Sequence, residues 1–188
     1  TNKNFKLKTV LKKLNVTPLK KTTIKFLNWF AEYNIIPKGM ALKLVLLSSN
    51  AVEKFQKEAF KTFNNNIKPS KIELSEEQKR SLKKMNISND KFRVHVLQGT
   101  TGSGKTIVYF SALKEIINKG FQGLILLPEI GLTSQFEKKF LEFFGITPAI
   151  WHSGVSKKKK EVIWSGVAND EIKVVIGARS SLFLPFKK

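Results

Sequence analysis

The sequence predicts an α/β fold with a mainly parallel sheet in its second half, and two observations lead to this fold class. From about residue 92 onward, short apolar runs rich in Val, Ile and Leu alternate with longer segments of helical periodicity. Strands that alternate with helices of ten or more residues pair in parallel through right-handed crossovers. A glycine-rich turn also lies where the first strand candidate passes into the next helix. We therefore expect a three-layer α/β domain.

Composition restricts the class of protein further. The chain has 188 residues, 41% of them hydrophobic, with 15 Phe and no Cys. This supplies one core and excludes a disulfide scaffold or a Cys-ligated metal site within these residues. No apolar run approaches the ~18 residues of a membrane span, so we expect a cytoplasmic protein. The chain opens on Thr and stops soon after an apolar run, and we expect it to be a fragment.

The net charge is +20, from 34 Lys and Arg against 14 Asp and Glu, and most of the basic excess lies before residue 94. Lysines that neutralise phosphates release condensed counterions, so a polyanion such as nucleic acid is one expected partner. The alternative is an A·T-rich genome that places Lys on every solvated face. Charge alone leaves both interpretations open.

The first half is expected to hold helices and a linker. After Thr17-Pro18, the apolar spacing predicts a helix over residues 19–33, and a second helix follows over 40–47. A Lys- and Asn-rich stretch with Pro69 then has the composition of a linker. These features divide the chain into a partial N-terminal domain (1–48), a linker (49–73) and an α/β lobe (74–188).

The lobe is expected to begin with a helix over 75–85, in which Ser75 and Gln78 have the spacing of a capping box. The remaining elements alternate. The predicted strands are 92–97, 123–127, 148–151 and 173–176, and the predicted helices are 105–118, 133–144 and 156–167.

The most specific motif is Gly99-Thr100-Thr101-Gly102-Ser103-Gly104-Lys105-Thr106, which satisfies G-x-x-x-x-G-K-[ST] between a predicted strand and a predicted helix. The glycines allow backbone N–H groups to turn inward around phosphate oxygens, and the helix adds its positive dipole end. Lys105 would reach the β- and γ-phosphates, and the Thr106 hydroxyl would ligate Mg²⁺. The alternative is a plain connecting loop. We predict a nucleoside triphosphate site.

Four blocks in this order resemble the PriA family, the superfamily 2 replication-restart helicases also called primosomal protein N′. The blocks are residues 97–109, 126–135, 152–154 and 175–183, and residues 7–19, 29–33 and 37–39 more weakly resemble the end of the family's N-terminal DNA-binding domain. The resemblance implies a RecA-like lobe of an ATP-dependent 3′-to-5′ DNA helicase. It also implies ATP and Mg²⁺ as cofactors, single-stranded and forked DNA as substrates, and other primosome proteins and single-strand-binding protein as partners.

The resemblance also assigns roles to residues outside the glycine loop. Gln78 matches the glutamine that reads the adenine edge, since an amide can donate and accept at once; the capping-box role remains the alternative. Glu129, Thr133 and Gln135 match the motif that lines the single-strand track, although Thr133 could also cap the next helix.

Further along, His152 and Ser153 match residues that shape the strand-binding surface. Arg179 would bind a phosphate of the tracked strand, with a salt bridge as the alternative. Only one other His, His95, is present, so a His-cluster metal site has little support. The run Lys157–Lys160 is either a solvated helix start, which we favour, or a source of electrostatic attraction for DNA.

In the family, a Walker B Asp-Glu-Glu-His motif soon follows the Pro-Phe that is Pro185-Phe186 here, so it would lie beyond Lys188. The arginine finger and the zinc-binding Cys module would also lie beyond that residue, and zinc is expected only there. We predict that this chain binds nucleotide but hydrolyses it negligibly. The rival functions are another superfamily 2 translocase of repair or recombination, and a non-enzymatic nucleic-acid-binding module with a silent loop.

Overall fold

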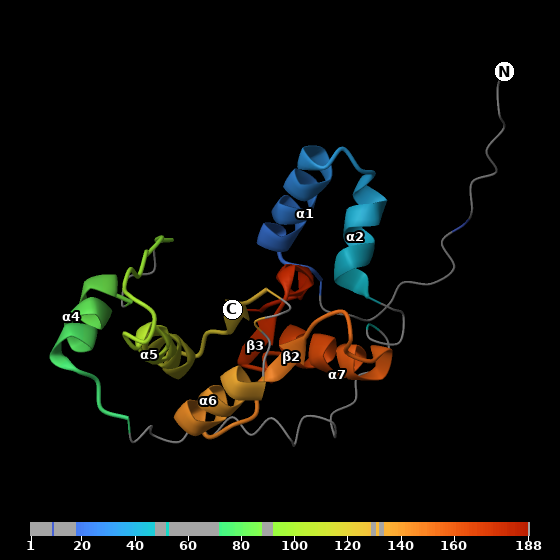
Figure 1. The fold of residues 1–188 in the computed structure, drawn as a ribbon. Helices are drawn as coiled ribbons and strands as arrows, with labels where there is room; N and C mark the ends of the chain where they lie inside the picture. Colours follow the sequence, from blue (N-terminus) through green and yellow to red (C-terminus); the bar gives the residue numbers. More distant parts are fainter. Residues whose placement is uncertain are drawn as a thin grey trace.

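The computed structural model describes residues 18–47, 72–87, 92–128 and 134–187, together with Thr9, Val52 and Gly131. Most of the predicted linker, residues 49–73, lies outside these residues. Along the chain the elements are α1 (Lys21–Tyr33), α2 (Lys38–Leu46), α4 (Glu76–Met85), α5 (Lys105–Asn118), β1 (Gly123–Leu126), α6 (Ser134–Phe144), β2 (Ala149–Trp151), α7 (Lys157–Ala168), β3 (Val174–Gly177) and the 3₁₀ turn η3 (Arg179–Phe183) (Figure 1). Within the described ranges, no helix has the length and apolar character needed to cross a bilayer.

The sheet has three strands in the order β1-β3-β2, and both pairings are parallel. Leu124 of β1 is opposite Val175 of β3, and Ile150 of β2 is opposite Ile176. All four residues of β3 are buried, as expected for a central parallel strand covered on both faces. The predicted α/β class with a parallel sheet is confirmed.

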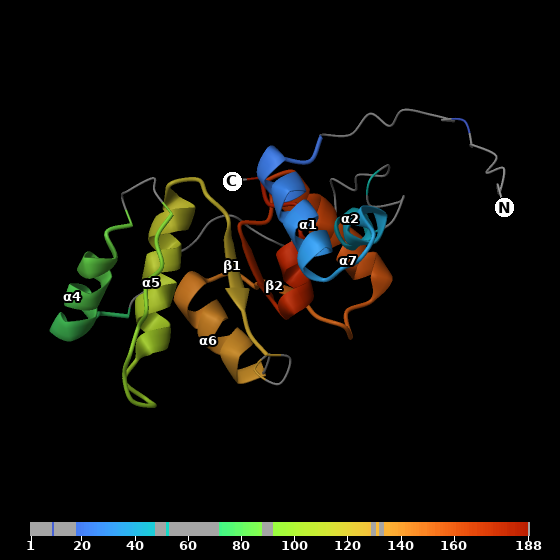
Figure 2. The same ribbon diagram turned by 90° about the horizontal axis from the view of Figure 1, so that it is seen from above.

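Helices cover both faces of the sheet, because successive strand residues point to opposite sides. Val174 and Ile176 of β3 pack with Phe110 of α5 and with the aromatic side chains of α6. Val175 points the other way and packs against α7. Figure 2 shows the three layers, with α5 and α6 on one side of the strands and α7 on the other.

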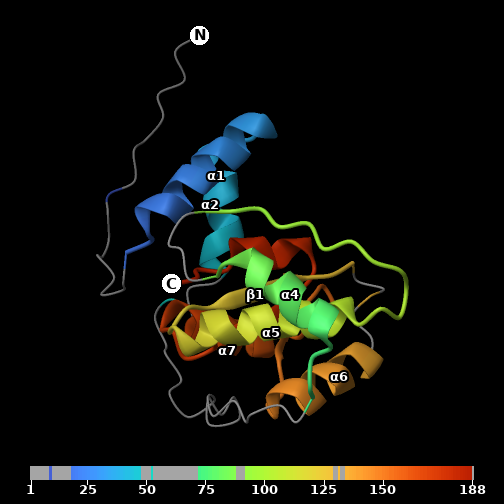
Figure 3. The ribbon, with the colours of Figure 1, turned by 90° about the vertical axis from the view of Figure 1, so that its left-hand side faces the viewer.

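The predicted first strand is not part of this sheet, and that prediction was wrong. Residues 92–100 form no regular element, and the side chains of Phe92 and Val96 are 92% and 89% exposed. Figure 3 shows this segment, in green, as an extended trace that passes outside the sheet. The alternation of apolar residues predicts a strand only if another strand offers its backbone groups. Among the residues that the structure describes, neither edge strand of the β1-β3-β2 sheet pairs with this segment, so its alternation is not realised as a strand.

Helices α1 and α2 form a hairpin that packs on the α7 side of the sheet (Figure 2). Leu27 and Ala31 of α1 meet Ala41 and Val45 of α2 in a small core, to which Phe183 of η3 contributes. The expected helix 19–33 begins instead at Lys21, and its N-cap Lys20 makes no side-chain capping bond. The second helix begins at Lys38, directly after Pro37.

One hydrogen bond and one aromatic contact join this hairpin to the rest of the chain. The indole Nε1 of Trp164 in α7 donates a hydrogen bond to the carbonyl of Val45. The ring of Phe183 packs edge-on against Phe30 with a centroid distance of 4.9 Å. The hairpin is therefore held against the lobe by contacts with both α7 and η3.

Candidate nucleotide and nucleic-acid site

The glycine loop ends where α5 begins, and its backbone has the conformation that such a turn requires. Gly102 and Gly104 have φ angles of +83° and +78°, in the left-handed region that side chains disfavour. Gly104 is the N-cap of α5, and no side chain caps that helix. The first backbone N–H groups of α5 therefore lack the side-chain acceptor that a helix start commonly has, which suits an anion.

The ammonium of Lys105 lies inside this loop. Its Nζ donates to the carbonyl oxygens of Gly99 and Thr100, both at 2.6 Å. The N–H of Ser103 also donates to the carbonyl of Thr100 at 3.2 Å, which closes the turn. A phosphate bound at the loop would compete with these two carbonyls for the lysine, and it would offer a full negative charge in place of neutral oxygens.

Gln78 is one partner of the capping box and also lies against the glycine loop. The side chain of Ser75 accepts from the N–H of Gln78, while Oε1 of Gln78 accepts from the N–H of Ser75, so the capping box is confirmed. The other end of the same amide reaches the glycine loop, because a Cβ on Gly104 would collide with Nε2 of Gln78. The capping box therefore holds the amide beside the loop, and Nε2 lies where it could face a bound nucleotide.

The loops after β2 and β3 meet at one edge of the sheet, because the carboxyl ends of parallel strands point the same way. The carbonyl of Trp151 accepts from the N–H of Ala178 at 2.9 Å, and the indole Nε1 of Trp151 donates to Oγ of Ser180 at 3.2 Å. These two bonds bring His152 and Ser153, which follow β2, next to Arg179, which follows β3. Three predicted strand-binding residues are thus neighbours.

Gly177 is required for this close approach of the two loops. A Cβ at Gly177 would lie 2.7 Å from the carbonyl oxygen of Trp151 and 2.7 Å from the side chain of Ser181. Ser181 is fully buried, and its hydroxyl donates to the carbonyl of Ala178. Periodicity gives Trp151 no role beyond that of a strand residue, although a Trp directly before His152 is a signal that the loop has an aromatic anchor.

Local bonds also fix the loop after β2. Nδ1 of His152 accepts from the N–H of Gly154 at 3.2 Å, and Nζ of Lys160 donates to the carbonyl of Ser153 at 3.2 Å. The same ammonium lies 5.9 Å from the ring centroid of Trp151. Lys157, Lys158 and Lys159 are exposed, as a solvated helix start requires. Across the described ranges no group of three or more His, Cys, Asp or Glu is arranged to hold a metal.

The other predicted strand-binding residues are placed as follows. Gln135 is exposed in the first turn of α6, and Arg179 is exposed at the start of η3. Within the part of the chain that the structure describes, Arg179 has no ion pair. Glu129 and Thr133 lie outside the described residues.

The glycine loop lies at the same edge of the sheet as these loops. Leu113 of α5 packs against Gly123 at the start of β1, whereas Tyr109, one turn earlier, lies beside Leu127 just after the end of β1. Lys105 is one further turn in the same direction, so α5 runs antiparallel to β1 with its first residues toward the carboxyl ends of the strands. Figure 2 shows the start of α5 and the tip of the β1 arrow at the same end.

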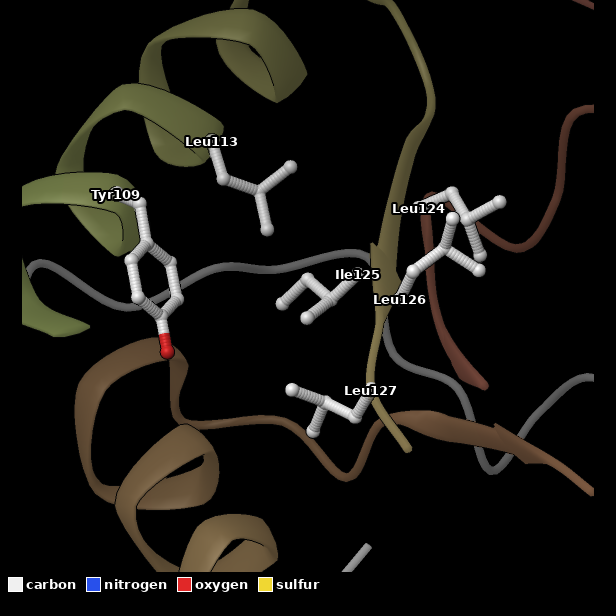
Figure 4. A pocket seen from close by; sticks show the side chains of 6 residues that line it. All are labelled: Tyr109, Leu113, Leu124, Ile125, Leu126 and Leu127. Atoms are coloured by element: carbon white, nitrogen blue, oxygen red, sulfur yellow. The ribbon is translucent and has the colours of Figure 1, made fainter. Parts of the chain in front are cut away.

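A cavity of about 360 Å³ lies between α5 and β1, next to this loop but distinct from it. Figure 4 shows that Tyr109 and Leu113 face Ile125 and Leu127 across it. Its lining is aliphatic apart from the Tyr109 ring and hydroxyl. Such a lining offers few hydrogen-bond partners to a triphosphate.

Comparisons with known proteins agree with this architecture. Residues 49–188 match the family model described as "Type III restriction enzyme, res subunit". The chain is 41% identical over 183 residues to "Replication restart protein PriA" of Rickettsia felis, covering 97% of this chain and 27% of that protein. It is 35% identical over 122 residues to the protein of the same name in Bacillus subtilis, covering 64% of this chain and 15% of that protein.

The parallel sheet, its flanking helices and the matched family model define a RecA-like P-loop lobe. The sequence relatives identify the family within this class of P-loop proteins. The chain belongs to the PriA family. It spans about a quarter of the length of the Rickettsia relatives that it matches.

Proposed function

We propose that this chain is the ATP-binding lobe of an ATP-dependent DNA helicase of replication restart. The observation that supports this most is the common position of the glycine loop and the loops after β2 and β3 at one edge of the sheet. A nucleotide at the glycine loop would then lie close to a nucleic-acid strand on the loops after β2 and β3. Binding of one could alter the grip on the other, which is what a translocating motor needs.

The residues of the glycine loop fit a nucleoside triphosphate with Mg²⁺. Backbone N–H groups at the start of α5 would bind phosphate oxygens, and Lys105 would leave the carbonyls of Gly99 and Thr100 for the β- and γ-phosphates. The hydroxyl of Thr106 would supply one ligand to Mg²⁺, which usually takes its other ligands from phosphates, water and one or two carboxylates. Gln78 would face the adenine. Bound Mg²⁺ would neutralise charge on the phosphates.

The DNA strand would run over the loops that follow the strands. Arg179 is exposed and its guanidinium suits a backbone phosphate, while His152, Ser153 and Gln135 lie on neighbouring loops or helix starts. Glu129 and Thr133 belong to the same proposed track. As in the family, the substrate would be single-stranded and forked DNA unwound in the 3′-to-5′ direction.

The whole protein would act in the cytoplasm with other primosome proteins and single-strand-binding protein. We propose that the present chain binds ATP but hydrolyses it negligibly, because the acidic Walker B motif and the arginine finger of the family are not among its 188 residues. Phosphate release by the purified chain should stay at background with or without single-stranded DNA. Stimulated release would contradict this part of the proposal.

Nucleotide binding is tested by titrating a fluorescent ATP analogue against the chain with Mg²⁺. The Lys105→Ala variant should bind at least about tenfold more weakly, since a hydrogen bond between charged groups is lost. Lys114→Ala is the matched control, because Lys114 lies on the same helix outside the loop and should bind like the wild type. Equal binding by Lys105→Ala would show that the loop does not hold the nucleotide.

A further inference from the structure

Lys160, in the first turn of α7, differs from the three lysines before it. Lys157, Lys158 and Lys159 are exposed, whereas Lys160 is half-buried. It lies three residues before Ile163, which is fully buried, so it belongs to the face of α7 that packs on the sheet. Side chains of a helix lean toward its N-terminus, so the ammonium of Lys160 is carried toward the loop that joins β2 to α7.

The ammonium of Lys160 meets two groups at this end of β2. Its Nζ donates to the carbonyl of Ser153 at 3.2 Å and lies 5.9 Å from the ring centroid of Trp151. A cation over a Trp ring is attracted by the negative face of the ring, and a hydrogen bond from a charged donor is stronger than one from a neutral donor. One cation therefore fixes both the backbone of the loop after β2 and the aromatic ring at the end of that strand.

Trp151 connects this cation to the loop after β3. The side chain is 6% exposed and packs in the core between the sheet and α7. Its indole Nε1 donates to Oγ of Ser180 at 3.2 Å, and its carbonyl accepts from the N–H of Ala178 at 2.9 Å. Because Ser180 directly follows Arg179, the position of the Trp151 ring determines where the turn that carries Arg179 lies.

We infer that Lys160 is a positioning residue for the proposed nucleic-acid site: through Trp151 and the carbonyl of Ser153, it sets the distance between the loops after β2 and β3. This role rests on the proposed function, in that the two loops hold the DNA strand. Lys160 itself does not touch the strand, because its ammonium is directed at the carbonyl and the ring. Loops that are already held together lose less conformational freedom when the strand binds, which increases affinity.

The indole signals of a two-dimensional proton–nitrogen NMR spectrum test this role without DNA. The Nε1–H of Trp151 donates to Ser180, and that of Trp164, on α7, donates to the carbonyl of Val45. Lys160→Met keeps an aliphatic side chain but removes the ammonium, so the Trp151 indole proton should exchange with solvent about two- to fivefold faster. The Trp164 indole is the internal control and should exchange at an unchanged rate. Unchanged exchange at Trp151 would overturn the inference.

Affinity for single-stranded DNA is the second readout, measured by fluorescence anisotropy with a labelled oligothymidylate of about 15 nucleotides. Lys160→Met should bind about three- to tenfold more weakly than the wild type. Lys160→Arg should restore the affinity, because a guanidinium can donate to the carbonyl and stack on the ring. Lys158→Met is the matched control, since it removes one charge from an exposed position of the same helix and should bind like the wild type.

Salt dependence separates positioning from direct contact with the strand. A lysine that binds a phosphate of a single strand contributes about 0.7 to the slope of log affinity against log salt concentration. Lys160→Met should keep the wild-type slope. A slope reduced by about this amount, or an equal loss of affinity in Lys158→Met, would overturn the inference.

Circular dichroism checks that each variant is folded. Should Lys160→Met not fold, Lys160→Gln takes its place with the same expected results. If the wild type does not bind oligothymidylate, the DNA-binding part of the proposed function fails, and the exchange rate of the Trp151 indole still decides whether Lys160 positions the two loops.

Discussion

The sheet and the glycine loop differ in how their structure is maintained. All residues of β2 and β3 are buried, and the aromatic residues of α6 pack around Phe110 within 5.3 to 5.7 Å between ring centroids. Helix α4, beside the loop, has no buried residue, and the segment that leads into the loop is exposed. The loop geometry therefore depends on local features, namely positive-φ glycines and a capping box, and not on a surrounding core.

This difference explains why the glycine-loop geometry is present although the segment before it forms no strand. A glycine turn and a helix start need only a few neighbouring residues. A strand needs hydrogen-bonding partners that are distant in sequence. The two regions should accordingly respond differently to the same kind of substitution.

Replacing one phenylalanine in each region should give the largest difference in the free energy of unfolding. Phe110→Ala should lower the free energy of unfolding by about 3–5 kcal/mol, because Phe110 is fully buried among five other rings. Phe92→Ala should change it by less than about 0.5 kcal/mol, since that side chain is exposed. Urea denaturation measures both. Comparable losses would mean that residue 92 is buried in solution and that the two regions share one core.

Substitutions at two glycines test the same difference between the sheet and the glycine loop in the backbone. Gly177→Ala should cost about 1–3 kcal/mol, because the new Cβ would press on the backbone of Trp151. Gly102→Ala meets no atom within 4 Å but must adopt a φ of +83°, which costs about 1–2 kcal/mol.

Nucleotide binding, measured on the folded fraction of each protein, distinguishes the Gly102→Ala variant from the Gly177→Ala variant. Gly102→Ala should weaken it, because the loop must distort. Gly177→Ala should weaken thermal stability first and nucleotide binding little. The reverse pattern would argue that Gly177 belongs to the phosphate site.

The smallest expected effect concerns the capping box. Ser75→Ala should destabilise α4 by about 1 kcal/mol, through loss of the bond that Oγ accepts from the N–H of Gln78. Hydrogen exchange should accelerate in α4 alone, because this helix adds no residue to the buried core. Ser81→Ala, within the same helix, should leave exchange unchanged. A fall in global stability after Ser75→Ala would mean that α4 unfolds together with the sheet.

The sequence predicted the locally determined parts of this fold well. The sequence correctly predicts the bounds of α5, 105–118, and the capping box of Ser75 and Gln78 at the start of α4. Strands β1, β2 and β3 lie within about one residue of their predicted ranges. All of these follow from periodicity and turn chemistry over a short window.

The features that the sequence did not predict depend on long-range contacts. The apolar alternation at residues 92–97 carried no information about whether a neighbouring strand is present. The bonds of Trp151 to Ala178 and Ser180, which bring the two strand-end loops together, join residues almost thirty positions apart. Nor could periodicity predict that the α1–α2 hairpin packs on Phe183 of η3.

The central proposal is that the glycine loop at the carboxyl edge of the sheet binds the phosphates of a nucleotide. Backbone amide NMR during a titration with Mg²⁺ and ADP tests it most directly. We predict that the largest chemical-shift changes fall on the amides of residues 99–106, with small changes at residues 123–127 beside the apolar cavity. Unchanged loop amides at saturating nucleotide, or changes concentrated along the cavity, would contradict the proposal.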